Sequence, residues 1–280
     1  MAFSPGTKNP DPNGPPTHSR YLLSCSADKT IRLWSLDLWQ CLVAYRSHDR
    51  PVWDVSWGPH GHYFLSGSGD GTARMWSTDR IDPLRIFQGH EQDVDVVAWH
   101  PNSAYTFTGS CDRTVRMWDI NRGTAVRMFT GHTGNVTALA CAPDSKTLAS
   151  ADDHGVIILW DLASGRRTKV MRGHARGGIW SLAWSVESTV LVSGGADGTV
   201  RVWDVFTKPE VAVNGKVAAE GGAGIKIDGV TGTVGGKKSK KGEVVVSADQ
   251  ISAFPTKKSP VYKVKFTGMN LCLAGGAYLP

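Results

Sequence analysis

Cysteine is scarce in this chain of 280 residues, and its five cysteines form no C-x-x-C pair. They are Cys25, Cys41, Cys111, Cys141 and Cys272. This odd set argues against a disulfide framework and a zinc ribbon, and we expect small core residues in a reducing compartment. No apolar run approaches the roughly 20 residues that span a membrane, and no signal peptide opens the chain, so no membrane association is expected.

Motifs of common enzyme classes are missing as well. The sequence has no G-x-S-x-G turn of a serine hydrolase and no H-E-x-x-H helix of a zinc protease. Residues 236–239 (Gly-Lys-Lys-Ser) lack the upstream glycine of a phosphate-binding loop. Four of the nine histidines recur periodically, and the others show no metal-ligand spacing. We therefore expect no catalytic residue, metal ion, cofactor or small-molecule substrate.

The formal net charge of +6 is concentrated in one stretch. Residues 207–258 contain nine lysines against five acidic residues, which leaves 22 basic against 20 acidic residues elsewhere. A basic stretch is a candidate nucleic-acid contact, but residues 208–242 contain no aromatic side chain that would stack on bases. We interpret this stretch as a solvated loop or a localisation-type patch, and we expect no sequence-specific contact with nucleic acid.

What the chain does contain is a repeat of 42 residues. Gly-His pairs end at His90, His132 and His174, and a Ser-His pair ends at His48 one period earlier. The tryptophans keep the same spacing, with one step of 43; they are Trp34, Trp76, Trp118, Trp160 and Trp203. A period of this length, with Gly-His at one end and Trp-Asp at the other, resembles the WD40 repeat. Each copy of that repeat is one four-stranded blade of a propeller.

Local sequence within one copy predicts the four strands of such a blade. In the second copy, runs rich in β-branched and aromatic residues span 52–57, 63–68 and 72–76, and glycine-rich turns separate them. A fourth run follows the tryptophan at 84–87. A sheet with two apolar faces is unstable alone, so the sheets are expected to pack face to face around an axis. The predicted fold is therefore all-β, a WD40 β-propeller.

Four side chains recur at fixed offsets in the copies: a histidine, a Ser or Thr ten residues before the tryptophan, an Asp six residues before it, and the tryptophan itself. The sets are His48, Ser66, Asp70 and Trp76; His90, Thr108, Asp112 and Trp118; and His174, Ser193, Asp197 and Trp203. The WD40 resemblance implies that each set is a buried hydrogen-bonded chain. An unpaired buried polar group costs about 1–3 kcal/mol, so the members must satisfy each other. We interpret the sets as structural, because a hydrolase triad is a single constellation and not a period.

The fourth copy departs from this pattern. Six residues before Trp160 stands a second histidine, so His132 and Ser150 lack the usual carboxylate. Asp152 and Asp153 come just ahead of that position. Two outcomes are open: this blade is held less tightly than its neighbours, or Asp153 swings in as the substitute.

The beginning of the chain predicts an incomplete blade. Residues 1–5 match the end of the inner strand in later copies, and the missing histidine would fall before Met1. We therefore expect residues 1–280 to be one N-terminally truncated propeller fragment. Residues 6–17, rich in Pro, Asn and Gly, are predicted to be a surface insertion.

The end of the chain also predicts incomplete repeats. Residues 208–242 have a composition that cannot bury enough surface to order itself, which predicts a disordered Lys/Gly-rich loop. Residues 243–247 are predicted as the delayed fourth strand of the fifth blade, and 260–266 and 270–274 as two strands of a last blade. The expected total is five blades plus part of a sixth.

Without a catalytic constellation, function is expected on the propeller surface. In such folds the Gly-His loop faces the mouth of the central channel, and the positions three and five after the histidine begin the inner strand there. These positions hold Trp53, Asp93, Asp95 and Asn135, together with Pro51, Thr137 and Gly177, and in the last copy Trp180 after a one-residue insertion. Trp53 and Trp180 are candidate anchors for a partner protein, and the alternative is that they pack against neighbouring blades. Asp93 and Asp95 are either a recognition patch or a solvated rim.

Segments that include residues between the repeat motifs carry a more specific resemblance than the motifs do. A blade does not require these intervening residues, so the repeat alone does not explain them. The segments are 41–43, 51–54, 73–79, 83–90, 100–103, 108–119 and 273–278. They are similar to the WD-repeat TBP-associated factors, the subunit 5 family of transcription factor TFIID. The resemblance covers nearly the whole chain except 6–17 and 208–242.

That resemblance implies a non-enzymatic scaffold in the nucleus that acts in transcription initiation by RNA polymerase II. Members of the family carry an N-terminal helical domain and a seven-bladed propeller that docks onto histone-fold TBP-associated factors. In fungi the same subunit also serves the SAGA coactivator. The implied partners are therefore histone-fold TBP-associated factors and other TFIID or SAGA subunits.

Two other classes stay open. Another WD40 adaptor, such as a ubiquitin-ligase substrate receptor or a G-protein β-like scaffold, would share every repeat feature. The W-D-x-R docking signature of many ligase receptors is absent, since the Trp-Asp pairs continue as Ile120-Asn121, Leu162-Ala163 and Val205-Phe206. An enzyme built on a propeller would need acidic or histidine side chains that converge in the channel, which the sequence does not suggest.

Overall fold

Each regular element in the described part of the chain is a β-strand, and each strand pairs antiparallel with its neighbour in sequence. The structure is a computed structural model that describes residues 1–5, 20–174, 177–206, 246–256, 259–267 and 270–276. Within these ranges no helix is long and apolar enough to cross a membrane. The predicted insertion at 6–17 and the predicted loop at 208–242 lie outside the described residues.

The strands form five four-stranded sheets and one two-stranded sheet, which we call the first to sixth blades. The first blade contains β1 (Ala2–Phe3), β2 (Tyr21–Cys25), β3 (Thr30–Ser35) and β4 (Gln40–Arg46). The second contains β5 (Val52–Trp57), β6 (Tyr63–Ser68), β7 (Thr72–Ser77) and β8 (Arg85–Gln88). The third contains β9 (Val94–Trp99), β10 (Tyr105–Ser110), β11 (Thr114–Asp119) and β12 (Ala125–Thr130). The fourth contains β13 (Val136–Cys141), β14 (Thr147–Asp152), β15 (Val156–Asp161) and β16 (Arg167–Arg172). The fifth contains β17 (Ile179–Trp184), β18 (Val190–Gly195), β19 (Thr199–Asp204) and β20 (Gln250–Pro255). The sixth contains β21 (Val261–Phe266) and β22 (Cys272–Gly276).

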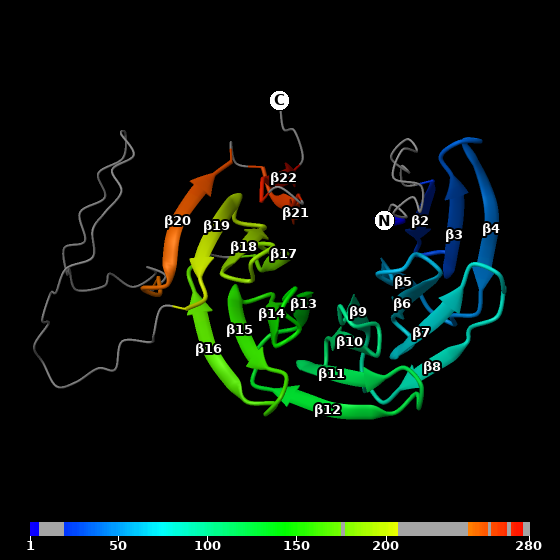
Figure 1. The fold of residues 1–280 in the computed structure, drawn as a ribbon, viewed down its shortest axis with the longest axis horizontal. Helices are drawn as coiled ribbons and strands as arrows, with labels where there is room; N and C mark the ends of the chain where they lie inside the picture. The colour runs from blue at the N-terminus through cyan, green and yellow to red at the C-terminus, as the bar shows by residue number, and fades with distance from the viewer. Residues whose placement is uncertain (6–19, 175–176, 207–245, 257–258, 268–269, 277–280) are drawn as a thin grey trace, which may run out of the picture.

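The blades follow one another around a common centre and form an arc that stays open between the sixth and the first (Figure 1). The first strand of each blade lies nearest the centre, and the fourth strand lies at the periphery (Figure 1). This arrangement confirms the prediction of an incomplete, all-β WD40-type propeller with five blades and part of a sixth.

The hydrophobic core is divided into clusters that lie between consecutive blades. Between the second and third blades, for example, Met75 and Phe87 pack with Val94 and Trp118. Burial on both faces explains why β7 is buried at all of its six positions. Trp76 is fully buried, whereas Trp34 of the first blade is only half-buried, because that blade has a neighbour on one side only. The apolar contacts that stabilise a blade are therefore supplied by its neighbours.

Tryptophans at the ends of inner strands also join consecutive blades by hydrogen bonds. The indole N–H of Trp57 donates to the carbonyl oxygen of Ala2 at 3.0 Å, and that of Trp99 donates to Ser56 O at 3.0 Å. Trp184 makes the same contact to the fourth blade. Each bond satisfies a buried indole donor with a backbone acceptor of the preceding inner strand, which fixes how the two blades meet.

The strands of the second copy match their predicted positions to within one residue, since 72–76 becomes Thr72–Ser77 and 84–87 becomes Arg85–Gln88. The two strands of the sixth blade are also present, the second one shifted to Cys272–Gly276.

The predicted fourth strand of the fifth blade at 243–247 is wrong. The strand that pairs with β19 is β20, and its ladder places Gln250 opposite Trp203. The reason is a buried ion pair: Lys169 Nζ of the fourth blade lies 2.7 Å from Asp249 Oδ1, and both side chains are almost fully buried. Asp249 must stand just before the strand to reach this lysine, so the strand begins at Gln250.

Candidate protein-interaction site

The recurring polar side chains form hydrogen-bonded chains in the second to fifth blades. In the second blade, Trp76 Nε1 donates to Ser66 Oγ at 2.9 Å, and Ser66 Oγ lies 2.7 Å from His48 Nε2. His48 Nδ1 lies 2.8 Å from Asp70 Oδ2. The corresponding His–Asp distances in the third, fourth and fifth blades are 2.7, 3.0 and 3.1 Å. The histidine belongs to the loop that enters each blade, so the chain ties this loop to the blade's second and third strands.

In the fourth blade the carboxylate comes from Asp152, not from the expected Asp153. Asp152 Oδ2 lies 3.0 Å from His132 Nδ1, and both side chains are fully buried. Asp153 Oδ1 instead accepts a hydrogen bond from the backbone N–H of Asn135. Both outcomes stated for this blade are therefore corrected: the chain is complete, and its acidic member stands at the end of β14, two residues earlier than in the other blades.

The chains hold their carboxylates in the charged form. Burial raises the pKa of Asp70, but the hydrogen bonds from His48 and Thr72 outweigh burial, and the pKa lies well below its ordinary value. The pKa of Asp112 in the third blade is lowered in the same way, because hydrogen bonds from His90 and Thr114 outweigh burial. A lowered carboxyl pKa means that the charged form contributes to the stability of the folded state.

Geometry argues against a catalytic role for these chains. The hydroxyl that would serve as a nucleophile is fully buried at Ser66 and at Ser150, and it accepts the indole N–H of the blade's tryptophan. A substrate cannot reach it. The described residues also contain no group of three or more His, Cys, Asp or Glu side chains that could hold a metal ion.

The channel mouth brings together the residues five positions after each histidine, or six in the fifth blade, where the loop has one extra residue. Trp53, Asp95, Thr137 and Trp180 line one cavity of about 260 Å³ where the inner strands begin. Tyr262 of β21 lines it too. Sequence reasoning missed Tyr262, because no repeat histidine precedes it. Its signal is register: Tyr262 is the second residue of its inner strand, as Trp53 is in β5 and Trp180 in β17.

Both tryptophans of the mouth are exposed and also contact a neighbouring blade. Trp53 is 49% exposed, and its Nε1 donates to Asp93 Oδ2 of the third blade at 3.0 Å. Trp180 is 39% exposed and stacks on Tyr262, with ring centroids 5.1 Å apart and an interplanar angle of 12°. Packing against a neighbouring blade and availability as a partner anchor are therefore compatible for these tryptophans. Contact with the next blade fixes each ring and leaves part of it open to solvent.

Acidic groups line the same cavity. Asp54 accepts hydrogen bonds from the backbone N–H of Val97 at 3.0 Å and of Val55 at 2.9 Å, and burial raises its pKa. Burial also raises the pKa of Asp95, which accepts a hydrogen bond from the Cys111 thiol at 3.0 Å. Lys263 lines the cavity as well, and its charge acts against burial to lower the pKa of Asp54. The mouth thus combines aromatic faces with partly desolvated carboxyl groups and a cation of the protein itself.

The structure separates the other two predicted rim residues from this cavity. Asp93 and Asn135, three positions after their histidines, line a neighbouring groove of about 660 Å³ together with Arg50 and Cys111. The bond between Trp53 and Asp93 joins the groove to the channel mouth. Of the predicted rim set, Trp53, Asp95, Thr137 and Trp180 therefore line the cavity at the channel mouth.

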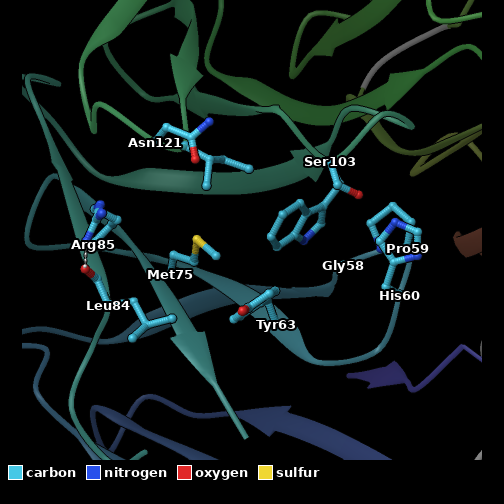
Figure 2. Close-up of a pocket in the computed structure, with 11 residues that line it drawn as sticks. Gly58, Pro59, His60, Tyr63, Met75, Leu84, Arg85, Ser103 and Asn121 are labelled. Carbon is cyan, nitrogen blue, oxygen red and sulfur yellow. Dashed lines mark hydrogen bonds between the residues drawn. The ribbon is translucent and has the colours of Figure 1, made fainter.

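A second surface feature lies at the opposite ends of the strands, between the second and third blades. This interblade pocket has a volume of about 400 Å³, and its walls include Tyr63, Met75, Leu84, Arg85, Trp99 and Asn121. Met75 and Tyr63 project into it, with Asn121 and Ser103 on the far side (Figure 2). No sequence pattern pointed to this pocket, because its walls come from two different repeats.

Successive four-stranded sheets, each held internally by a buried chain of Trp, Ser or Thr, His and Asp, with exposed aromatic residues at the channel mouth, define a propeller of the protein-binding class. Comparison with protein families finds the WD domain, G-beta repeat, at residues 15–35, 39–77, 81–119, 123–161 and 165–204. The chain belongs to the WD40 family. Propellers of this family are generally non-enzymatic scaffolds for protein–protein interaction.

Proposed function

We propose that this protein is the WD-repeat scaffold subunit of the general transcription factor TFIID, and of a SAGA-type coactivator, and that it acts in the nucleus. Its partners in this proposal are histone-fold TBP-associated factors. The observation that carries a scaffold role is the channel mouth, where Trp53, Trp180 and Tyr262 stand near the start of inner strands and contacts with the next blade hold both tryptophan rings in place. Rigid aromatic side chains at the centre of a surface are the usual anchors of a protein interface.

Support for this particular assembly comes from the residues between the repeat motifs. The segments 83–90 and 100–103 resemble the WD-repeat TBP-associated factors, and most of their residues lie outside the repeat motifs. In the structure they supply β8, which is exposed at three of its four residues, and the turn after β9. Exposed positions of this kind are available to a partner protein.

Affinity purification of the tagged full-length protein from nuclei tests the proposal. Histone-fold TBP-associated factors are expected to copurify. Recovery of a cullin adaptor or of G-protein subunits in their place would overturn the assignment and identify a different WD40 adaptor. The same purification with a channel-mouth variant shows whether this surface is the one that the partners use.

A further inference from the structure

The interblade pocket lies between the second and third blades, and two side chains fill the corresponding space between the third and fourth blades. At the pocket, one of these side chains is absent and the other points elsewhere. Between the third and fourth blades, the imidazole of His100 is buried and its Nε2 lies 3.3 Å from Ser145 O. One period earlier the same position is Gly58. A Cβ atom at Gly58 would lie 3.3 Å from Trp99 Cζ2, so the glycine allows the indole to approach and leaves the space beside it empty.

A cationic side chain closes the next two interfaces but not this one. Arg127 Nη2 donates to Ala163 O of the fourth blade at 2.7 Å, and Lys169 Nζ donates to Asp204 O of the fifth blade at 2.9 Å. Arg85 stands at the same place in the repeat, yet its Nη1 donates to its own neighbour, Leu84 O, at 2.8 Å (Figure 2). The guanidinium of Arg85 is exposed and carries further N–H donors at the edge of the pocket.

The chemistry of the walls limits what can bind. The inner walls are apolar, formed by Met75, Leu84, Trp99 and Ile120, and the rim carries Arg85 and His60. The lining contains no Asp or Glu. A volume of about 400 Å³ is large enough for an aromatic side chain with an apolar neighbour and falls within the range of ligand pockets.

We propose that the interblade pocket binds an acidic peptide segment of a partner protein, which inserts an aromatic or leucine side chain against Trp99 and Met75 and places a carboxylate on Arg85. Charge complementarity selects this occupant, since a basic segment would meet Arg85 and His60 without a compensating carboxylate in the lining. The pocket lies at the opposite ends of the strands from the channel mouth. The proposal is therefore independent of the assignment to TFIID.

Fluorescence anisotropy on the full 280-residue chain tests this inference. The probe is a short fluorescein-labelled peptide in which one phenylalanine and one leucine are flanked by aspartate and glutamate. Two matched peptides replace the acidic residues by lysine, or the phenylalanine and leucine by alanine. The acidic peptide is expected to bind saturably, and both matched peptides at least about tenfold more weakly, because the pocket recognises both features.

Two pocket variants and two control variants locate the binding site. Arg85→Glu is expected to weaken binding of the acidic peptide by about tenfold, and Tyr63→Ala by several-fold, with unchanged thermal melting in Arg85→Glu. Arg122→Glu is the matched control, because Arg122 is 82% exposed in the turn between β11 and β12 and does not line the pocket. Trp180→Ala is expected to leave binding unchanged.

Four results would overturn the inference. They are equal affinity of Arg85→Glu and the unaltered chain, tighter binding of the lysine peptide, loss of binding in Trp180→Ala, and absence of saturable binding. Failure of the TFIID proposal would show up separately, as the wrong set of copurified proteins, and would leave these affinities untouched.

Discussion

His132 Nδ1 lies 3.0 Å from Asp152 Oδ2 in the fourth blade, although the repeat places its acidic residue two positions later everywhere else in the second to fifth blades. Asp152 also accepts hydrogen bonds from the backbone N–H groups of His154 and Val156. A single carboxylate therefore satisfies the imidazole and the turn, so a histidine is tolerated where the pattern has an aspartate.

Removal of this carboxylate should destabilise the protein strongly. We expect Asp152→Ala to lower the free energy of unfolding by about 2–3 kcal/mol, because the buried His132 loses its partner. Asp153→Ala is the matched control, with an expected loss below about 1 kcal/mol, since Asp153 is 41% exposed and accepts from one backbone N–H. Urea unfolding measures both. A larger effect of the Asp153 variant would contradict the assignment of Asp152.

Stability should fall in acid because of the same chains. The folded-state pKa values of Asp70 and Asp112 are lowered, so their contribution is fully present above the unfolded-state value of about 4 and is lost as the pH falls below it. The free energy of unfolding is therefore expected to decrease between about pH 4 and pH 2. Urea unfolding across this range provides the measurement. In Asp70→Asn the decrease should be smaller, and an identical slope would show that Asp70 does not contribute.

Thiol reactivity should differ sharply between the cysteines. Burial raises the pKa of Cys141 to about 12, and burial together with the neighbouring Asp95 raises that of Cys111 to about 12. Cys41 is exposed. At about pH 8, brief treatment of the folded protein with iodoacetamide is expected to modify Cys41 and spare the other two, because the thiolate is the reactive form. Peptide mass spectrometry reads the outcome, and rapid labelling of Cys111 would contradict the burial of that thiol.

Partner binding should depend on the aromatic residues of the channel mouth. We expect Trp180→Ala to weaken partner affinity by at least about tenfold, because its ring is exposed and held by Tyr262. Trp39→Asn is a suitable control: Trp39 is 84% exposed outside the mouth, and asparagine tolerates its positive φ of 52°. Quantitative copurification from nuclei compares the two. Equal recovery of partners would mean that they bind elsewhere.

The sequence by itself determined the blade and its repetition. The spacing of His48, Ser66, Asp70 and Trp76 placed the members of a buried chain correctly, because each member occupies a fixed position on a strand or turn of one blade. Runs of β-branched and aromatic residues placed the strands of the second copy to within one residue for the same reason. These features depend on local geometry, which a periodic sequence displays directly.

Tertiary structure decided whatever depends on contacts between repeats. The ion pair between Lys169 and Asp249 set the start of β20, and it joins residues that are 80 positions apart. Tyr262 reached the channel mouth through a strand that no repeat histidine marks. The interblade pocket arose from a glycine in one blade beside a tryptophan of the next. Neighbouring blades meet through side chains whose partners lie a full period or more away, and only the packed arc brings these partners together.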